Sequence, residues 1–236
     1  TTLFAYTGFP DEQKSTSPII PLVNANNSGW QTGIQIQNVG SASASVTVNY
    51  KPGPGTGRAC TETQTIPAGQ SKTYALNAFA GVPLAGMTTT CAAKVRFVGS
   101  ATVTSTVPLQ IIVNQLKATS GGAYNVVNPT SATKKVIFPL VMDRNGPYFT
   151  GFNIVNVGSS PTNIHCTFQN SSTVFDATNV PAGGSVNHIQ LNKLTAGYIG
   201  SAMCVSSATN ILGQLNEATT YGNNDGLLVY EGINIP

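Results

Sequence analysis

The chain has 236 residues, of which 41% are hydrophobic and only 8% are charged, and its formal net charge is +3. Typical soluble domains carry about a quarter charged residues, so this composition favours β-structure with polar, uncharged faces and fits a cytosolic enzyme poorly. The basic residues do not cluster, which argues against nucleic acid as a partner. No apolar run approaches the roughly 18 residues of a membrane-spanning helix, so we expect no membrane insertion.

The first predicted element is a short strand at the N-terminus, TTLFAYTGFP (residues 1–10). A polar segment bounded by prolines, residues 10–18, follows it and would span about 25–30 Å if extended at roughly 3.3 Å per residue. Because the chain starts with Thr rather than Met, we also expect processing from a secreted precursor. The residues of this strand that could contact a partner are Leu3, Phe4, Ala5, Tyr6 and Phe9.

Strands of period two follow, separated by turn-forming residues. TGIQIQNVG (32–40) and ASVTVNY (44–50) alternate apolar and polar side chains, as half-buried antiparallel strands do. KPGPGTG (51–57) and IPAGQ (66–70) are typical turns. No window shows a helical apolar stripe. About seven short strands in roughly 110 residues predict an immunoglobulin-like β-sandwich.

The second half of the chain repeats the first. IIPLVNANNSGWQTGIQIQNVGS (19–41) matches IFPLVMDRNGPYFTGFNIVNVGS (137–159) at a constant offset of 118 residues. Shorter matches pair 66–71 with 180–185, 97–105 with 198–206, and 112–119 with 211–219. The sequence thus predicts an all-β fold of two tandem immunoglobulin-like antiparallel β-sandwich domains with an extra N-terminal strand. The predicted boundaries are an extension at 1–17, domain 1 at 18–130 and domain 2 at 131–236.

Three strand-like segments lie at the boundaries of the repeats. The first two are again separated by 118 residues. AYTGFP (5–10) stands before repeat one as AYNVVN (123–128) stands before repeat two, and VYEGINIP (229–236) ends the chain. AYNVVN is predicted to be the last strand of repeat one. Two repeats need two closing strands, so the N-terminal one is spare.

These residues resemble a repeat of secreted and surface-anchored bacterial proteins. The resemblance rests on PLV…GWQTGIQIQNVGS, IPAGQS, FVGSATVTS and the closing Y-x-G-F, and it extends over nearly the whole chain, twice. It implies tandem immunoglobulin-like sandwiches at the cell surface and implies no catalytic residues. The chain departs from that repeat in the hairpin 51–60, in the segment 87–94 and in its cysteines.

The four cysteines are expected to form two disulfides. Cys60 and Cys91 lie in the two departures of repeat one, while Cys166 and Cys204 align with strand residues of that repeat, Val48 and Val103. The predicted pairs are Cys60–Cys91 and Cys166–Cys204, and the alternative is free buried cysteine. Each bridge would close a loop worth roughly 3.5–4 kcal/mol on the chain-entropy model. Paired cysteines predict an oxidising, extracellular location.

Nothing in the sequence predicts catalysis, a cofactor or a metal site. The carboxylates are scattered singly, and the two histidines, His165 and His188, are expected on polar sheet faces. No nucleophile elbow, phosphate loop or metal-ligand spacing is present. We therefore expect that the protein is not an enzyme.

Two aromatic residues and two sequons are candidates for ligand contact and modification. Trp30 and Tyr148 occupy equivalent loops, where they could stack on sugars or, in the interpretation we prefer, cap the sandwich. NNS at Asn26 and NSS at Asn170 are glycosylation sequons.

The spare strand suggests a structural role. Strand addition to the second repeat of a neighbouring copy would join subunits head to tail, and such a heterologous contact generates an open filament or a ring. The sequence therefore favours a subunit of an extracellular, pilus-like filament whose partner is its own copies. The alternatives are a monomeric surface adhesin or carbohydrate-binding module that binds a glycan or a host surface, and a viral fibre or capsid decoration protein.

Overall fold

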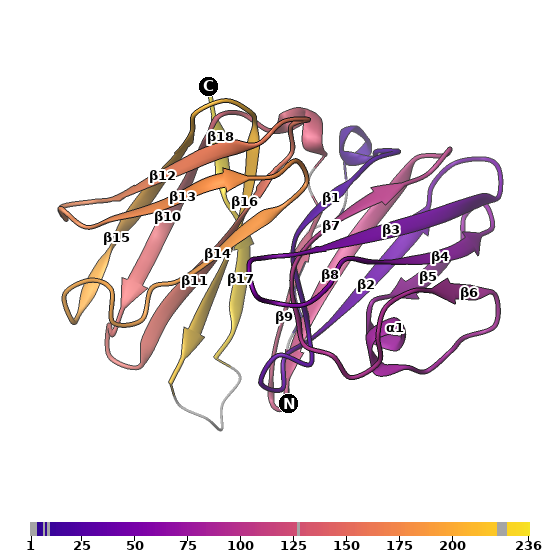
Figure 1. Cartoon of the computed structure of the whole chain (residues 1–236), viewed down its shortest axis with the longest axis horizontal. Helices are drawn as coiled ribbons and strands as arrows, with labels where there is room; N and C mark the ends of the chain where they lie inside the picture. Colours follow the sequence, from indigo (N-terminus) through magenta and orange to yellow (C-terminus); the bar gives the residue numbers. More distant parts are fainter. Residues whose placement is uncertain (1–3, 7, 9, 127, 221–225) are drawn as a thin grey trace.

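The computed structural model describes residues 4–6, 8, 10–126, 128–220 and 226–236. Figure 1 shows two groups of strands side by side, built from the first and the second half of the chain. The strands form four antiparallel sheets, two in each half. The all-β antiparallel sandwich fold expected from the sequence is confirmed.

The N-terminal half packs a five-stranded sheet, in the order β1-β7-β3-β4-β6, on a four-stranded sheet, β5-β2-β8-β9. Its elements are η1 (Asp11–Gln13), β1 (Ile19–Ala25), β2 (Gln31–Asn38), β3 (Ala44–Pro52), β4 (Cys60–Ile66), β5 (Ser71–Tyr74), α1 (Leu76–Ala80), β6 (Met87–Thr89), β7 (Phe97–Thr104), β8 (Leu109–Lys117) and β9 (Ser120–Asn125).

The C-terminal half has sheets in the orders β13-β12-β15-β10-β18 and β14-β11-β16-β17. Its elements are η2 (Pro129–Ser131), β10 (Lys135–Asp143), β11 (Tyr148–Asn156), β12 (Thr162–Phe168), β13 (Val174–Val180), β14 (Ser185–Ile189), β15 (Tyr198–Ser206), β16 (Ile211–Thr219), β17 (Leu228–Glu231) and β18 (Ile233–Ile235).

Strand pairing places the two repeats in register at every sequence match but one. The alignment of 112–119 with 211–219 is wrong by three residues, because Val113 pairs with Ile34 while Leu215 pairs with Phe152, the repeat counterpart of Ile34. Val113 therefore corresponds to Leu215, an offset of 102 residues rather than 99. Shifting β16 by an odd number of residues would turn its buried side chains outward. Burial of these side chains therefore favours the observed register over the alignment with more identical residues.

The strand order shares its central pairs with immunoglobulin domains and differs at the edges. The pairs β2–β5 and β3–β7 correspond to B–E and C–F of the constant-type order ABED/CFG. β1 pairs with β7 and β8 pairs with β2, whereas an immunoglobulin A strand pairs with B and G with F. The first and last of these strands have therefore exchanged sheets.

Each half has its own apolar core, built by period-two alternation. β8 buries Leu109, Ile111 and Val113, and the residues between them are partly exposed. Two separate clusters of buried residues result, one drawn from residues 20–126 and the other from 136–215. At about 1.5–3 kcal/mol for each large buried side chain, these cores are the main source of folding free energy in both halves.

The structure contains the two disulfides that the sequence predicts. Cys60 at the start of β4 is bonded to Cys91, and Cys166 is bonded to Cys204. The second pair joins residues directly opposite each other on β12 and β15, at the positions that Val48 and Val103 hold in the N-terminal half.

The polar segment after the N-terminal residues is not the extended leash expected from the sequence. Residues 11–13 form η1, and Ser15 then makes a two-way backbone bridge with Leu109 at the start of β8. The backbone N–H of Val103 donates to the carbonyl of Pro18. The segment is shortened because its backbone groups are satisfied on the N-terminal sandwich rather than by water.

A tyrosine closes each half by hydrogen bonding to the first strand. Tyr124 of β9 donates its hydroxyl to the carbonyl oxygen of Leu22 at 2.8 Å, and Tyr230 of β17 donates to the equivalent Leu140. Both leucines follow a proline at a register shift in β1 or β10. In each half, the tyrosine hydroxyl donates to a carbonyl that the interrupted strand pairing leaves without a backbone donor.

We predict that Tyr124→Phe lowers the free energy of unfolding by about 1–3 kcal/mol, because the Leu22 carbonyl is left buried without its donor. Tyr230→Phe should cost less, because Tyr230 is only partly buried and water can replace its hydroxyl. Denaturant unfolding of both variants measures the difference. A cost at Tyr230 equal to or above that at Tyr124 would contradict this account.

Candidate functional site

The most distinctive surface of the molecule is the seam between its halves. The ammonium group of Lys51 donates to the carbonyl of Ala182 at 2.7 Å, and the hydroxyl of Ser100 donates to the carbonyl of Gly183 at 2.8 Å. Both acceptors lie in the turn between β13 and β14. Ser100 is fully buried by this contact, so the turn is docked on the outer face of the N-terminal sheet.

Side-chain amides form the middle of the seam. Asn153 of β11 donates to the carbonyl of Pro21 in β1. Gln115 and Asn216 exchange two amide hydrogen bonds, at 2.9 and 3.2 Å, between β8 and β16. A smaller apolar cluster at the same seam contains Ile19, Ala132, Val155, Leu212 and Val157. The two halves are therefore held by several satisfied polar contacts and one apolar patch.

The closing strands of the two halves meet at this seam, beside the N-terminal residues (Figure 1). Val229 of β17 packs on Gly122 of β9 and on the N-terminal core. Ala5 and Tyr6 line a hollow of about 290 Å³ with both strands. The N-terminal residues therefore lie next to the two strands that their sequence resembles.

The described N-terminal residues belong to no strand in the single chain. Phe4, Ala5 and Tyr6 have no regular secondary structure, and Tyr6 is 59% exposed. Of the predicted contact residues, Leu3 and Phe9 lie outside the described residues. The aromatic ring of Tyr6 is thus available to a partner.

Two glutamates of the C-terminal half are held in poorly solvated places. Burial raises the pKa of Glu217, the β16 residue that corresponds to Gln115. Burial also raises the pKa of Glu231, although hydrogen bonds from its own backbone and from the N–H of Asn125 oppose this shift. The second contact crosses the seam, so the ionisation of Glu231 is coupled to the packing of the halves.

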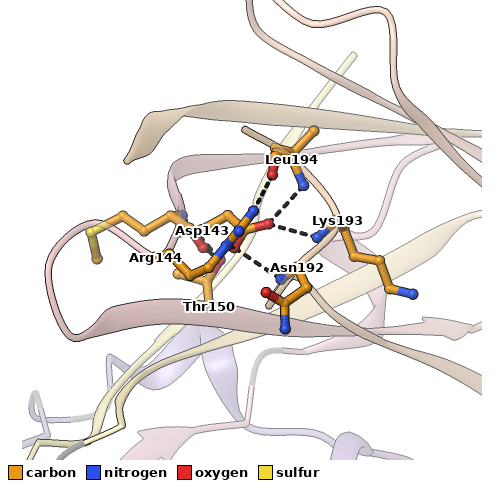
Figure 2. A network of polar contacts seen from close by, with 7 residues as sticks. Asp143, Arg144, Thr150, Asn192, Lys193 and Leu194 are labelled. Carbon is orange, nitrogen blue, oxygen red and sulfur yellow. Dashed lines mark hydrogen bonds and ion pairs between the residues drawn. The ribbon is translucent and has the colours of Figure 1, made fainter. Parts of the chain in front are cut away.

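A third carboxylate, Asp143, fixes a turn of the C-terminal half (Figure 2). Figure 2 shows its oxygens accepting from the backbone N–H groups of Asn192, Lys193 and Leu194, at 2.6–3.0 Å, and from the Arg144 side chain. Burial alone would raise the pKa of Asp143, but these hydrogen bonds, led by that of Leu194, outweigh it and lower the pKa. Asp143 therefore serves as a structural anchor.

A buried carboxylate also organises the N-terminal core. Glu62 accepts from the Tyr50 hydroxyl at 2.9 Å, the Gln64 amide at 2.9 Å and the backbone N–H of Ala75 at 2.8 Å. Ala75 has φ +66° and ψ −59°, a γ-turn conformation that is rare because it is strained. Burial raises the pKa of Glu62, although these hydrogen bonds oppose the shift. Glu62 thus holds the turn into α1.

The predicted ligand-facing aromatics are placed differently from each other. Trp30 is partly buried, with the Lys117 ammonium 5.7 Å from its ring centre, and it lines a small hollow of about 100 Å³. Tyr148 is 42% exposed at the equivalent place of the second half. Trp30 therefore caps its loop, and of these two residues only Tyr148 has an exposed ring.

The two sequons also differ. The Asn26 amide nitrogen donates to the carbonyls of Phe79 and Val95, so a glycan there would remove at least one of these contacts. This occupied nitrogen argues against the sequence prediction at Asn26. Asn170 is exposed in the turn between β12 and β13, where a glycan fits without rearrangement.

The histidines do not form a site together. His165 is exposed and 2.7 Å from the Asp176 carboxylate, as expected for a polar sheet face. His188 instead stacks on Phe152 and Phe175 with ring centres 4.9 and 4.4 Å apart, so its predicted place on a polar face is wrong. Burial lowers the pKa of His188. The described residues contain no group of three potential metal ligands.

No helix in the described ranges has both the length and the hydropathy needed to cross a membrane.

No family model matches this chain, and no curated protein matches its sequence. Among solved structures, Thermotoga maritima 1070 is similar to 44% of this chain and to 96% of its own length, with 22% identity and a TM-score of 0.38. Serine-rich repeat protein Srr2 from Streptococcus agalactiae is similar over 93% of both chains, with 11% identity and a TM-score of 0.21. Neither likeness is close enough to support an argument about function.

We predict that Glu217→Gln flattens the dependence of stability on pH. A raised carboxyl pKa makes the folded state bind its proton more tightly, so stability is lost as pH rises above the ordinary value of about 4.3. The glutamine removes that loss. Denaturant unfolding at pH 5 and pH 8 should show a smaller difference for the variant than for the parent chain. An unchanged difference would contradict the assignment.

Asp143 should contribute a pH dependence of stability opposite to that of Glu217, and Asp143→Asn tests this. A lowered pKa gives stability that is present at neutral pH and lost on acidification. The amide places an NH₂ group against backbone donors, at a cost of about 1–3 kcal/mol for each donor left unsatisfied. The variant should be less stable than the parent at pH 7 and approach it in acid. Equal stability at pH 7 would show that the turn does not depend on this carboxylate.

Proposed function

We propose that this protein is a structural subunit of an extracellular, pilus-like filament, in which the N-terminal segment of one copy joins the C-terminal half of the preceding copy. One observation carries the proposal: the N-terminus repeats the linker between the two halves. η1 and η2 lie 118 residues apart, and each is followed by a bridge to equivalent strands, Ser15 to Leu109 and Thr133 to Ile211.

The central linker shows what precedes such a turn. Before η2, the chain forms β9, which belongs to the sandwich ahead of the linker and supplies its closing Tyr124. By the same arrangement, residues 4–8 belong to a sandwich ahead of η1. The described N-terminal half has no place for them, because β9 already closes it. A preceding copy of the chain supplies such a sandwich in its C-terminal half.

The C-terminal half offers a suitable edge. β17 closes it with only four paired residues, and Leu228 is 62% exposed, whereas β9 has six residues that are almost all buried. An incompletely covered edge is where strand addition occurs. Tyr6 would then lie on an added strand beside β17, whose own Tyr230 already donates to Leu140. The two disulfides support an oxidising, extracellular location for the assembly.

The competing hypothesis of a monomeric adhesin or carbohydrate-binding module is favoured by one residue, the exposed Tyr148. A single ring gives one stacking surface, and the counterpart Trp30 is covered by Lys117. We therefore rank this function second. Glycan binding by dispersed monomers would reverse the ranking.

Deletion of residues 1–9 tests the proposal. We expect the full chain to form fibres visible by negative-stain electron microscopy, and the deletion variant to remain monomeric with an unchanged melting temperature. Tyr6→Ala should weaken assembly about ten- to a hundredfold, from a burial contribution of about 1.5–3 kcal/mol. Fibres that persist after the deletion would overturn the role of the segment.

A further inference from the structure

The seam joins two different surfaces, and each half has a structural counterpart of the surface that it does not use. The β1 face of the N-terminal half is Pro21, Lys51, Ser100 and Gln115. The β11 face of the C-terminal half, which covers it, is Asn153, Ala182, Gly183 and Asn216. The strand register shows which residues of the other half are equivalent to each face. The equivalent of the β1 face lies on the C-terminal half, and we call it the β10 face: Pro139, Gln169, Ser201 and Glu217. The equivalent of the β11 face lies on the N-terminal half, and we call it the β2 face: Gln35, Ala68, Gly69 and Asn114.

The β10 face is open where the β1 face is closed. Pro21 is buried and Ser100 is fully buried at the seam, whereas Pro139 is exposed and Ser201 is partly exposed. β18 pairs with β10 only at residues 135–137 and leaves the part that begins at Pro139 uncovered. The C-terminal half therefore presents an unoccupied equivalent of the surface through which the N-terminal half is held.

The β2 face is open as well. Gly183 is buried in the seam, while its counterpart Gly69 is exposed in a turn of the same sequence pattern, Pro-Ala-Gly. Both glycines have positive φ, +64° and +71°, so the two turns present their carbonyls alike. Ala68 is exposed, and Gln35 and Asn114 are partly exposed. The docking turn of the seam thus has a free copy on the N-terminal half.

Donors and acceptors match between the two open faces as they do in the seam. Ser201 keeps the hydroxyl that Ser100 donates, although in the single chain this hydroxyl donates to the side-chain oxygen of Gln169 at 3.2 Å and would have to turn to the partner. Gln169 has an amide donor in the place of the Lys51 ammonium, and Gln35 has one in the place of Asn153. Each would meet a backbone carbonyl, which every residue provides. The fourth contact would pair Asn114 with Glu217, a donor with an acceptor, and Glu217, which is only 9% exposed in the single chain, would have to turn outward to make it.

We propose that the β10 face of one copy binds the β2 face of the next, repeating the seam between copies. The two faces differ, so the contact is heterologous and propagates into an open chain of copies. This inference rests on the proposed function and identifies the surfaces that meet beside the joining segment. Gln37 and Gln110 stand where Val155 and Leu212 form the apolar patch of the seam, so this contact is more polar and depends on the N-terminal segment.

Substitutions on each face test the inference in the full chain. Ala68→Arg places a long charged side chain at the docking turn, and Ala85→Arg is the matched control on an exposed loop outside both faces. On the other face, Gln169→Glu replaces the donor with a charged acceptor, and Gln169→Lys restores the type of donor that Lys51 provides. We expect A68R and Q169E to raise the critical concentration for assembly by about tenfold or more, equivalent to about 1.4 kcal/mol. A85R and Q169K should assemble like the parent chain.

Mixing provides the second measurement. A68R keeps an intact β10 face and Q169E keeps an intact β2 face, so an equimolar mixture should form dimers that neither variant forms alone, as measured by light scattering. Assembly of A68R and Q169E at the parent concentration, with loss only on deletion of residues 1–9, would overturn this inference and leave the proposed function standing. Loss in A68R and Q169E but not in the deletion variant would overturn the role of the segment and keep the faces. A parent chain that stays monomeric would overturn both.

Discussion

Each half of the molecule depends on how it closes a strand that proline has interrupted. Pro21 and Pro139 carry no N–H, and the pairing of β1 and β10 shifts register around them. The carbonyl of the next leucine accepts from a tyrosine hydroxyl of the closing strand. A strand with this tyrosine closes each half, and the N-terminal segment carries a third tyrosine in the same sequence context, Tyr6. We base the filament proposal on this resemblance.

The sequence predicted the features that depend on local chemistry. Alternation at Ile34 and Ile36 identified half-buried strands, and the 118-residue offset identified the repeat. Cysteine placement predicted both disulfides: Cys166 and Cys204 lie opposite each other on β12 and β15, and Cys60–Cys91 joins β4 to the segment after β6. The alignment of β16 with β8 could not be predicted from sequence identity alone. The segment ILGQL matches the first repeat better in a frame that would expose its apolar side chains.

The seam could not be predicted, because its residues have no sequence signal of their own. Gln115, Asn153 and Ser100 lie in strands that are rich in polar residues, and nothing local separates them from exposed neighbours. The signal lies in a comparison between halves: Ser100 is buried and Ser201 is partly exposed at equivalent positions. The same limit applied to Asn26, whose sequon is intact in sequence while its amide is occupied in the fold.

The disulfides limit how far the chain can be extended when its ends are pulled. Cys166–Cys204 joins directly opposite strands, and Cys60–Cys91 joins β4 to the segment after β6, so pulling on the chain ends cannot extend the residues between them. The separations of 38 and 31 residues withhold about 125–135 Å and 100–110 Å of contour length at 3.3–3.6 Å per residue. The fully extended chain is therefore shorter by these lengths, and the residues enclosed by each disulfide stay unextended until that bond is reduced.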